Sequence, residues 1–365
     1  MNILWPLFVA LVIILAQMLI VYFGGHRRLA YTRRFSKPGV YAGETVELME
    51  VMTNDKWMPL PVVKVESRIP PQLRFSRQQG MDLGENDQYH LSLFALSGRR
   101  RVTRHHQVLC TQRGYYNLNS VTLTLSDALG ILNRFKTFQP QAELLVYPQL
   151  LELGQLPQAF ARYQGDLTVR RYIQPDPFLI NGIRPYRPGD NLRDVHWGAT
   201  ARVGELQVKT HDYTAHPQVL IYLNIQESEN LWGEMDAAAQ QRMEQGIRLC
   251  ATLAAQLLSQ GFEVGFYTNA DVVPEGDTVR VAPAGGELQR ERIMRAMAHL
   301  RVRRKNSFHM QLDEDIRAGL KGLDIALVSC YMSPLLSERV GRLRAMGNTV
   351  TYLPIPDGEE AQAHG

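Results

Sequence analysis

The stretch that decides the fold of the C-terminal half is Val219-Leu-Ile-Tyr-Leu-Asn-Ile225, a short apolar run without alternation. Such a run is typical of a strand that is buried on both faces of a sheet. Similar strand-like runs follow at 262–267, 323–329 and 349–353. Because helical patterns separate these runs, they predict right-handed crossovers and a doubly wound parallel sheet over residues 217–356.

The helical patterns lie between these strands, where apolar residues recur at a spacing of three and four. They predict helices over 236–260 and 287–300, and a third helix that begins at Ser333-Pro334, a cap followed by a first-turn proline. The C-terminal half is therefore expected to be an α/β domain. Residues 357–365 are expected to form a flexible tail.

The N-terminal half has a different, all-β pattern. Strand-like segments such as 45–52, 62–66 and 89–96 recur at roughly 8–12 residue spacing, with turn residues between them. They predict a β-sandwich over residues 38–148, without a catalytic constellation. The basic run at 99–101 is interpreted as a solvated hairpin tip, with contact to anionic lipid headgroups as the alternative.

The chain begins with a run at 3–23 that contains no charged side chain. At about 1.5 Å per residue its length matches a hydrocarbon core of about 30 Å, so we expect a transmembrane helix within residues 1–25 that contacts the lipid bilayer. A cleavable signal peptide is the first alternative, but no Lys or Arg precedes the run. A buried core helix is the second, but no amphipathic period is visible.

The basic residues that follow this run set the expected topology. Arg27, Arg28, Arg33, Arg34 and Lys37 all lie on its C-terminal side. The positive-inside rule then places the soluble domains in the cytoplasm, as parts of a single-pass protein of the cell membrane.

Composition excludes several classes of protein. The 365 residues are 45% hydrophobic and 21% charged, which suits two globular domains, and a net charge of +4 is too small to indicate a nucleic-acid partner. The cysteines Cys110, Cys250 and Cys330 are too far apart for a zinc site or a disulfide framework. No phosphate-binding, dinucleotide-binding or hydrolase motif is present, so neither a cofactor nor an enzymatic activity is expected.

The segment between the two domains, residues 160–216, has the most distinctive sequence. Pro188-Gly189 suits a type II turn, in which Gly supplies a positive φ. Asp190 is expected to cap a short helix that begins at Asn191. Arg193 and Trp197 are four residues apart, so they would share a face of that helix and allow a cation–π contact.

This segment resembles the hallmark of an uncharacterised bacterial membrane-protein family, of von Willebrand factor A-like type, that is associated with MoxR-type AAA ATPases. The hallmark is approximately R-x-Y-x-x-G-D-x-x-R-x-I-x-W-x-x-[ST]-A-R-x-x-x-L-x-V-K. The matching residues are Arg184, Tyr186, Gly189, Asp190, Arg193, Trp197, Thr200, Ala201, Arg202, Leu206, Val208 and Lys209. Arg113-Gly-Tyr-Tyr, Ser126-Asp-Ala-Leu-Gly-Ile-Leu and Val146-Tyr-Pro look like further blocks of the family, although its members often have two membrane helices.

The role of the motif remains open between three readings. It contains no nucleophile with a partnered base, so a catalytic role is the least favoured. A ligand-binding role is the second reading. The favoured reading is a structural clasp between the two soluble domains, with Trp197 mostly buried. The candidate residues are Arg184, Tyr186, Gly189, Asp190, Arg193, Trp197, Arg202 and Lys209.

The resemblance also directs attention to the loop after the first strand of the α/β domain. Related metal-binding domains have D-x-S-x-S there, which supplies hard oxygen ligands for Mg²⁺. In this chain Asn224, Gln226 and Ser228 occupy those positions. Two amides and one hydroxyl lack the anionic charge that a hard divalent cation requires, so no metal is expected.

Three functional hypotheses follow. The first is a membrane-anchored interaction or scaffold module, for which the resemblance implies a MoxR-type AAA ATPase as partner in the assembly or activation of other proteins. The second is a receptor-like protein that binds a ligand through a divalent cation. The third is an enzyme with an unrecognised site near Asp190 and Arg193. The oligomeric state is left open.

Overall fold

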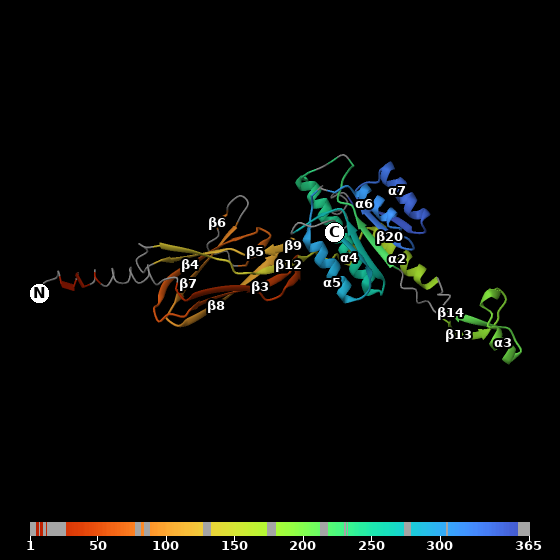
Figure 1. The fold of residues 1–365 in the computed structure, drawn as a ribbon, viewed down its shortest axis with the longest axis horizontal. Helices are drawn as coiled ribbons and strands as arrows, with labels where there is room; N and C mark the ends of the chain where they lie inside the picture. Colours follow the sequence, from red (N-terminus) through yellow and green to blue (C-terminus); the bar gives the residue numbers. More distant parts are fainter. Residues whose placement is uncertain are drawn as a thin grey trace. The chain divides into compact units, whose positions relative to one another are not determined.

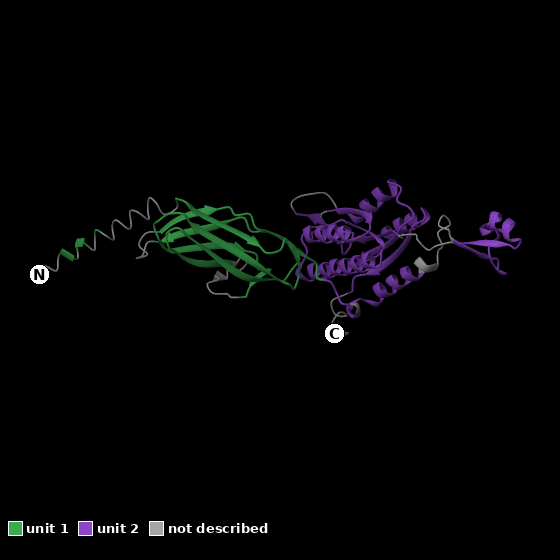
Figure 2. Cartoon of the chain, turned by 90° about the horizontal axis from the view of Figure 1, so that it is seen from below, with its two compact units in different colours: residues 1–149 green, residues 150–365 purple. Residues whose placement is uncertain are grey.

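The protein is described from a computed structural model. The described residues are 5–6, 8–9, 12, 27–76, 82–83, 88–126, 133–173, 180–211, 218–229, 231, 233–273, 279–303 and 306–356. The chain divides into two compact units, Met1–Gln149 and Leu150–Gly365 (Figure 2). The expected tail at 357–365 lies outside the described residues.

No helix among the described residues is long and apolar enough to cross a membrane. The predicted fold class was therefore wrong in its first element, the transmembrane helix within residues 1–25. Hydropathy and length measure whether a segment is able to cross a bilayer, and they do not establish that it forms such a helix. Much of the run at 3–23 lies outside the described residues. The cytoplasmic location, which depended on that helix, stays a prediction.

The described strands of the first unit form three sheets, ordered β1-β3-β8-β5, β11-β10-β4-β7-β6 and β2-β12-β9 (Figure 1). All neighbouring strands are antiparallel except β2 and β12. The bounds are β1 Leu29–Phe35, β2 Gly39–Tyr41, β3 Thr45–Asn54, β4 Leu60–Ile69, β5 Leu73–Phe75, β6 Asp82–Leu83, β7 Gln88–Leu96, β8 Arg100–Cys110, β9 Gly114–Asn117, β10 Val121–Ser126, β11 Asn133–Phe138 and β12 Glu143–Tyr147.

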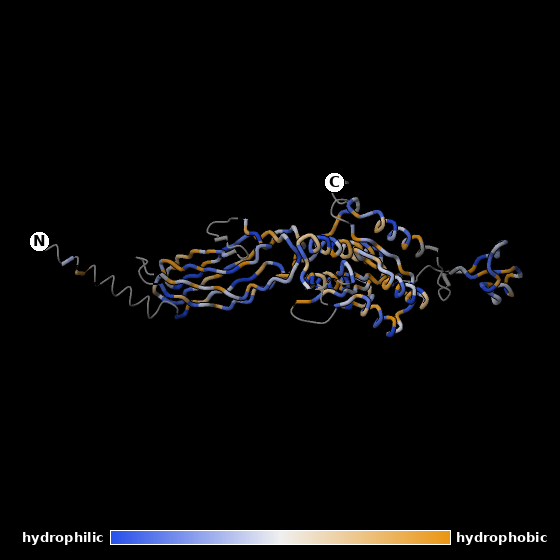
Figure 3. The backbone as a smooth tube through the Cα atoms, turned by 90° about the horizontal axis from the view of Figure 1, so that it is seen from above, coloured by the Kyte–Doolittle hydropathy of each residue, from blue (hydrophilic) through white to orange (hydrophobic). Residues whose placement is uncertain are grey.

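The two larger sheets pack face to face, which confirms the predicted β-sandwich. Hydrophobic and hydrophilic residues alternate along their strands (Figure 3), and the apolar positions face inward. One apolar cluster joins Leu29 and Met52 of the first sheet to Val63, Phe94 and Leu123 of the second. A strand thus has one face in the core and the other in solvent.

The sandwich includes residues that the sequence had assigned to other roles. Strand β1 begins at Leu29, before the predicted boundary at residue 38. Arg33, interpreted as part of a membrane flank, points into the sandwich and is 3% exposed. Arg99 has a φ of 50° in the turn before β8, and Arg100 and Arg101 are exposed there, as expected for a hairpin tip.

The second unit mixes helices and strands. Its sheets are ordered β13-β14, β18-β16-β15-β20-β21 and β17-β19. The bounds are η1 Leu153–Gln155, α2 Gln158–Ile173, β13 Ile180–Pro185, η2 Leu192–Asp194, α3 Trp197–Val203, β14 Gln207–His211, β15 Gln218–Leu223, α4 Ala237–Ser259, β16 Glu263–Thr268, β17 Asp271–Val272, β18 Val279–Ala284, α5 Glu287–His299, β19 Leu300–Arg301, α6 Phe308–Arg317, β20 Asp324–Ser329, α7 Pro334–Ala345 and β21 Thr349–Pro354.

The five-stranded sheet has helices on both faces (Figure 1). Strand β15 pairs in parallel with β16 and β20, and β20 pairs in parallel with β21. Leu220 and Tyr222 of β15 pack against α6 and α7 on one face. Leu223 lies on the other face, near Gly246 of α4. The sheet is therefore doubly wound, with β18 as an antiparallel edge strand that the sequence did not predict.

Gly265 in β16 tests the close packing of this edge. A Cβ at this position would lie 2.9 Å from the carbonyl oxygen of Val281 and 2.9 Å from the nitrogen of Pro283, both backbone atoms of β18. We expect Gly265→Ala to reduce the free energy of unfolding by about 1–3 kcal/mol, measured by urea denaturation.

The matched control is Gly341→Ala in α7, where a Cβ would have no atom within 4 Å. This change should increase the free energy of unfolding by about 0.5–1 kcal/mol, since Gly is unfavourable inside a helix. Similar denaturation midpoints for both variants would contradict the packing of β16 against β18.

Candidate functional site

Residues 180–211 are called the motif unit below. They contain the antiparallel strand pair β13 and β14, and η2 and α3 lie between these two strands in the sequence (Figure 1). Beyond the strand register, the amide of Tyr186 donates to Leu206 O at 2.8 Å and the amide of His196 donates to Gln207 O at 2.8 Å. Val195 and Val208 form a β-bridge and are each 3% exposed. Since so few side chains are buried, polar contacts and turn geometry must define much of the shape.

The strongest of these polar contacts joins Arg184 to Asp190. The guanidinium donates through Nη1 and Nη2 to the two carboxylate oxygens at 2.7 Å each, a bidentate ion pair. The amide of Arg187 donates to Asp190 Oδ2 at 2.8 Å. These contacts, with the Arg184 hydrogen bond as the largest cause, lower the pKa of Asp190 to about 2. Gly189 has a φ of 106°, as the predicted turn requires.

The helix caps of the motif unit differ from those predicted. Asn191, not Asp190, caps η2 by accepting from the amide of Arg193 at 3.1 Å. The assignment to Asp190 was wrong because Arg184 and Arg187 already occupy its carboxylate. His196 Nδ1 caps α3 by accepting from the amide of Ala199 at 3.0 Å, so Nδ1 carries no proton in this arrangement.

The end of α3 is fixed in a similar way. Gly204 adopts a left-handed φ of 79° after the helix. The hydroxyl oxygen of Thr200 accepts from the amide of Gln207 at 3.0 Å and ties the helix to β14. The motif unit therefore has a defined conformation despite its small core.

Trp197 is 70% exposed, so the prediction that it is mostly buried was wrong. It occupies the first position of α3, a short helix without a buried side chain. The prediction that Trp197 and Arg193 share one helix face was also wrong, because η2, which contains Arg193, ends at Asp194 before α3 begins. A bulky aromatic in a polar segment indicates a contact, but it does not indicate whether that contact lies within the chain or with another molecule. The clasp between domains stays a prediction.

The other motif residues are also accessible. Arg193 and Arg202 are exposed, while Tyr186 and Lys209 are half-buried. Large apolar side chains are exposed beside them. They are Ile183 at 47%, Leu192 at 66%, Val203 at 62% and Leu206 at 41%.

Two of the degenerate metal positions, Asn224 and Gln226, lie in a hydrogen-bonded network at the carboxyl ends of the parallel strands. Asn224 is fully buried and donates through Nδ2 to Ser329 Oγ at 3.1 Å. Its Oδ1 accepts from the amide of Gln226 at 3.0 Å and from Asn269 Nδ2 at 3.3 Å. The side chain thus joins the ends of β15, β16 and β20.

Gln226 has a structural contact of its own. Its Oε1 accepts from the amide of Phe308 at 2.9 Å, at the first residue of α6. Ser228 is half-buried, and the nearby Glu229 accepts from the hydroxyl of Ser333. Asn224 and Gln226 are thus engaged with backbone groups and with neighbouring side chains. The absence of a magnesium site at this edge stays a prediction.

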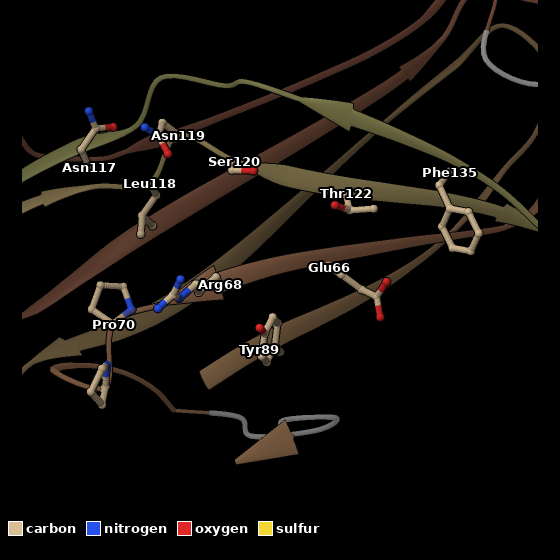
Figure 4. Close-up of a pocket in the computed structure, with 11 residues that line it drawn as sticks. Glu66, Arg68, Pro70, Tyr89, Asn117, Leu118, Asn119, Ser120, Thr122 and Phe135 are labelled. Atoms are coloured by element: carbon tan, nitrogen blue, oxygen red, sulfur yellow. The ribbon is translucent and has the colours of Figure 1, made fainter. Parts of the chain in front are cut away.

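A hollow of about 870 Å³ lies on the outer face of the sandwich, a place that the sequence did not indicate. Glu66, Arg68, Tyr89, Thr122 and Phe135 line its floor and sides (Figure 4). Tyr89 is 48% and Phe135 67% exposed. Aromatic residues at outward positions of β7 and β11 were the signal available in the sequence. Glu66 is paired with Lys64 at 2.6 Å, so the hollow does not present a free acid from that residue.

Comparison with known proteins supports an uncharacterised bacterial family. Residues 182–317 match the family model described as "Protein of unknown function DUF58". The "Uncharacterized protein YeaD" of Bacillus subtilis (strain 168) is 21% identical over 258 residues, which are 69% of this chain. The chain spans 60% of the length of that relative. Neither description names a von Willebrand factor A-like type or an association with MoxR-type ATPases.

Solved structures resemble about a third of the chain. The CARDB domain of the PF1109 protein from Pyrococcus furiosus matches 32% of this chain and 94% of its own, at 16% identity and a TM-score of 0.20. A non-cellulosomal cohesin from Archaeoglobus fulgidus matches 32% of this chain and 90% of its own, at 10% identity and a TM-score of 0.22. Such low scores do not support an argument about function.

Asn224→Asp tests the amide network. A carboxylate cannot donate to Ser329 Oγ, and it would place a charge where the side chain is 0% exposed. We expect this variant to lose about 1–3 kcal/mol of the free energy of unfolding, and Mg²⁺ should not restore it. Ser228→Ala, at a half-buried position, should unfold like the parent. A stable Asn224→Asp variant, or one that Mg²⁺ stabilises, would instead indicate a cation site.

Asp190 gives a pH-dependent prediction. With a pKa of about 2 instead of 3.8, its carboxyl should be about 1% protonated at about pH 4, where an ordinary aspartic acid is about 40% protonated. The ion pair therefore contributes fully above about pH 3.8, and the contribution is lost as the pH falls through about 2. NMR of the carboxyl carbon should show little change between about pH 6 and pH 4. Arg184→Gln should move the titration towards the ordinary value, and a parent that already titrates there would contradict the ion pair.

Proposed function

We propose that this chain is a non-enzymatic protein-interaction module, and that the motif unit binds a AAA ATPase of MoxR type in the assembly or activation of other proteins. The partner class comes from the resemblance of residues 184–209 to the family hallmark. The match of residues 182–317 to DUF58 supports that resemblance. The doubly wound sheet is compatible with the von Willebrand factor A-like type that the resemblance includes.

The observation that carries the proposal is the exposed surface of the motif unit. Trp197 is 70% exposed, and Arg193 and Arg202 are exposed on the same small unit. Trp and Arg are the residues most enriched at the energetic centres of protein interfaces. The exposed Leu192 and Val203 add apolar area that water solvates poorly. Such a surface suits a partner that covers the apolar side chains and pairs with the guanidinium groups.

The internal contacts of the motif unit make this surface rigid before binding. The Arg184–Asp190 pair closes the turn, His196 caps the start of α3 and Gly204 ends it. A surface that is already ordered loses less conformational freedom on association, so more of its contact energy remains as affinity. The motif residues that are not exposed therefore have a function too, because they position those that are.

Hydrogen bonds in the motif unit and around Asn224 argue against the other two hypotheses, an enzyme and a cation-dependent receptor. Both oxygens of Asp190 accept hydrogen bonds, and His196 Nδ1 is used as a helix cap, so neither is available as a base. A cation-dependent receptor would need anionic ligands near Asn224, where amides bind one another. A protein-interaction role requires neither a free base in the motif unit nor a metal ligand near Asn224.

Trp197→Ala separates an interface from a structural clasp. We expect the purified variant to bind a MoxR-type AAA ATPase from the same genome at least about tenfold more weakly, equivalent to about 1.4 kcal/mol. Its free energy of unfolding should stay within about 0.5 kcal/mol of the parent, as for other surface changes. Biolayer interferometry and thermal denaturation measure the two quantities.

The matched control is Trp57→Ala. Trp57 is 77% exposed in the first unit, so it controls for the loss of an exposed Trp outside the motif unit. The Trp57→Ala variant should bind the ATPase with the affinity of the parent chain. A Trp197→Ala variant with parental affinity would exclude this surface, and one with clearly lowered stability would favour the clasp.

A further inference from the structure

A polar cluster is buried inside the β-sandwich, between its two larger sheets. Glu50 of β3 and His106 of β8 come from one sheet, and His90 and Ser92 of β7 come from the other. Glu50 is 0%, His90 5% and Ser92 2% exposed, and the side chain of His106 is 19% exposed. Along β3, Glu50 stands between Leu48 and Met52, which belong to two separate apolar clusters. Polar side chains therefore replace apolar ones in the middle of the core.

The ligand atoms of this cluster converge. His106 Nε2 lies 3.0 Å from Glu50 Oε2, and the Ser92 hydroxyl donates to the same oxygen at 2.9 Å. The Ser92 hydroxyl oxygen is also 3.0 Å from His90 Nε2. One ligand atom each of Glu50, His90 and His106 lies within 4.8 Å of the others. Three strands thus direct two imidazole nitrogens and one carboxylate oxygen towards one point.

We propose that Glu50, His90 and His106 form a binding site for a divalent transition-metal ion, with Zn²⁺ as the best fit. Two imidazoles and one carboxylate are an established ligand set for zinc, and imidazole favours transition metals over Mg²⁺ or Ca²⁺. Zinc ligands at about 2.0–2.2 Å from the ion lie about 3.3–3.5 Å apart in a tetrahedron. His106 Nε2 and Glu50 Oε2, 3.0 Å apart, are already close to this separation. Binding would therefore mainly require the His90 imidazole to move closer, by no more than about 1.5 Å, and the Ser92 hydroxyl or a water would complete the tetrahedron.

The surroundings orient these ligands. The Tyr31 hydroxyl donates to Glu50 Oε1 at 2.7 Å, which leaves Oε2 towards the histidines. The Phe75 ring stacks on His90 with centroids 4.4 Å apart and meets His106 edge-on at 5.8 Å. Outer contacts of this kind fix ligand orientation at metal sites and strengthen binding. The partial exposure of His106 provides a route for the ion from solvent.

Two arginines lie beside the cluster, and one of them, Arg33, stands opposite Glu50 in the pairing of β1 with β3. Arg33 of β1 donates through Nε to Leu118 O at 3.2 Å and through Nη2 to Ser120 O at 3.4 Å. Arg104 of β8 lies over the Phe94 ring, 4.4 Å from its centroid. The positive charge of Arg33 lowers the affinity for a cation, and the two imidazoles and the carboxylate must offset this effect.

The neighbouring His105 provides a matched control. Successive residues of a strand point to opposite faces, so His105 faces away from the core, where it pairs with Glu47 at 3.0 Å. Its side chain is 53% exposed. His105→Ala and His106→Ala therefore remove the same group from adjacent positions of β8, and only the second removes a proposed ligand.

The test uses the full chain, purified without a histidine tag and treated with a chelator, with Zn²⁺ added alone. Calorimetry should show one ion per chain with micromolar or tighter affinity, and Zn²⁺ should raise the melting temperature. His105→Ala should retain this binding, and His106→Ala should weaken it at least tenfold. Co²⁺ in place of Zn²⁺ should give the visible absorption of a four-coordinate ion with nitrogen and oxygen ligands.

Two results would overturn the proposal. One is a parent chain that binds no stoichiometric Zn²⁺ and shows no change in melting temperature. The other is equal affinity in His105→Ala and His106→Ala, since the ion would then lie elsewhere. If His106→Ala does not fold, Tyr31→Phe replaces it: this change keeps the ring, removes the hydrogen bond to Glu50 and should weaken binding about tenfold.

Discussion

The second unit depends on the burial of one strand from both sides. Val219, Leu220, Ile221, Tyr222 and Leu223 of β15 are all 0% exposed. Because the strand has parallel neighbours on both edges and helices on both faces, every side chain after Gln218 must be packed. Asn224 follows the strand, and its side-chain amide forms hydrogen bonds with backbone and side-chain groups of the surrounding loops. Removing its hydrogen bonds would affect three strands at once, which is why an amide suits this position better than a metal-binding carboxylate.

The motif unit is built on a different principle. Its shape comes from a bidentate ion pair, two helix caps and one tertiary hydrogen bond that Thr200 accepts from the Gln207 amide, and hardly from apolar burial. Side chains that would be buried in a larger domain, Trp197 foremost, remain exposed. The unit therefore combines a fixed backbone with an apolar, basic surface, and the proposed interaction role depends on this combination.

The sequence predicted periodic features well and contact-dependent features poorly. The run at 219–225 and the alternation at 45–52 identified the sheet and the sandwich, because burial on one or two faces leaves a direct pattern in the residues. Ser333 caps α7 as predicted, since a cap and a first-turn proline act locally. Asp190 was assigned the wrong partner because two local contacts competed for one carboxylate. The exposure of Trp197 and the gathering of Glu50, His90 and His106 depend on residues far apart in the chain, which no local pattern records.

The parallel pairing of β2 with β12 sets an order for the folding of the first unit. Val40 lies opposite Val146, so the first and last parts of the sandwich are neighbours in one small sheet. During synthesis on a ribosome, β2 must wait for almost the whole unit to emerge before it finds its partner. Closing so long a loop is entropically costly and slow compared with forming a hairpin. Local pairs such as β10 with β11 are therefore expected to form first, and the pairing of β2 with β12 is expected to follow late.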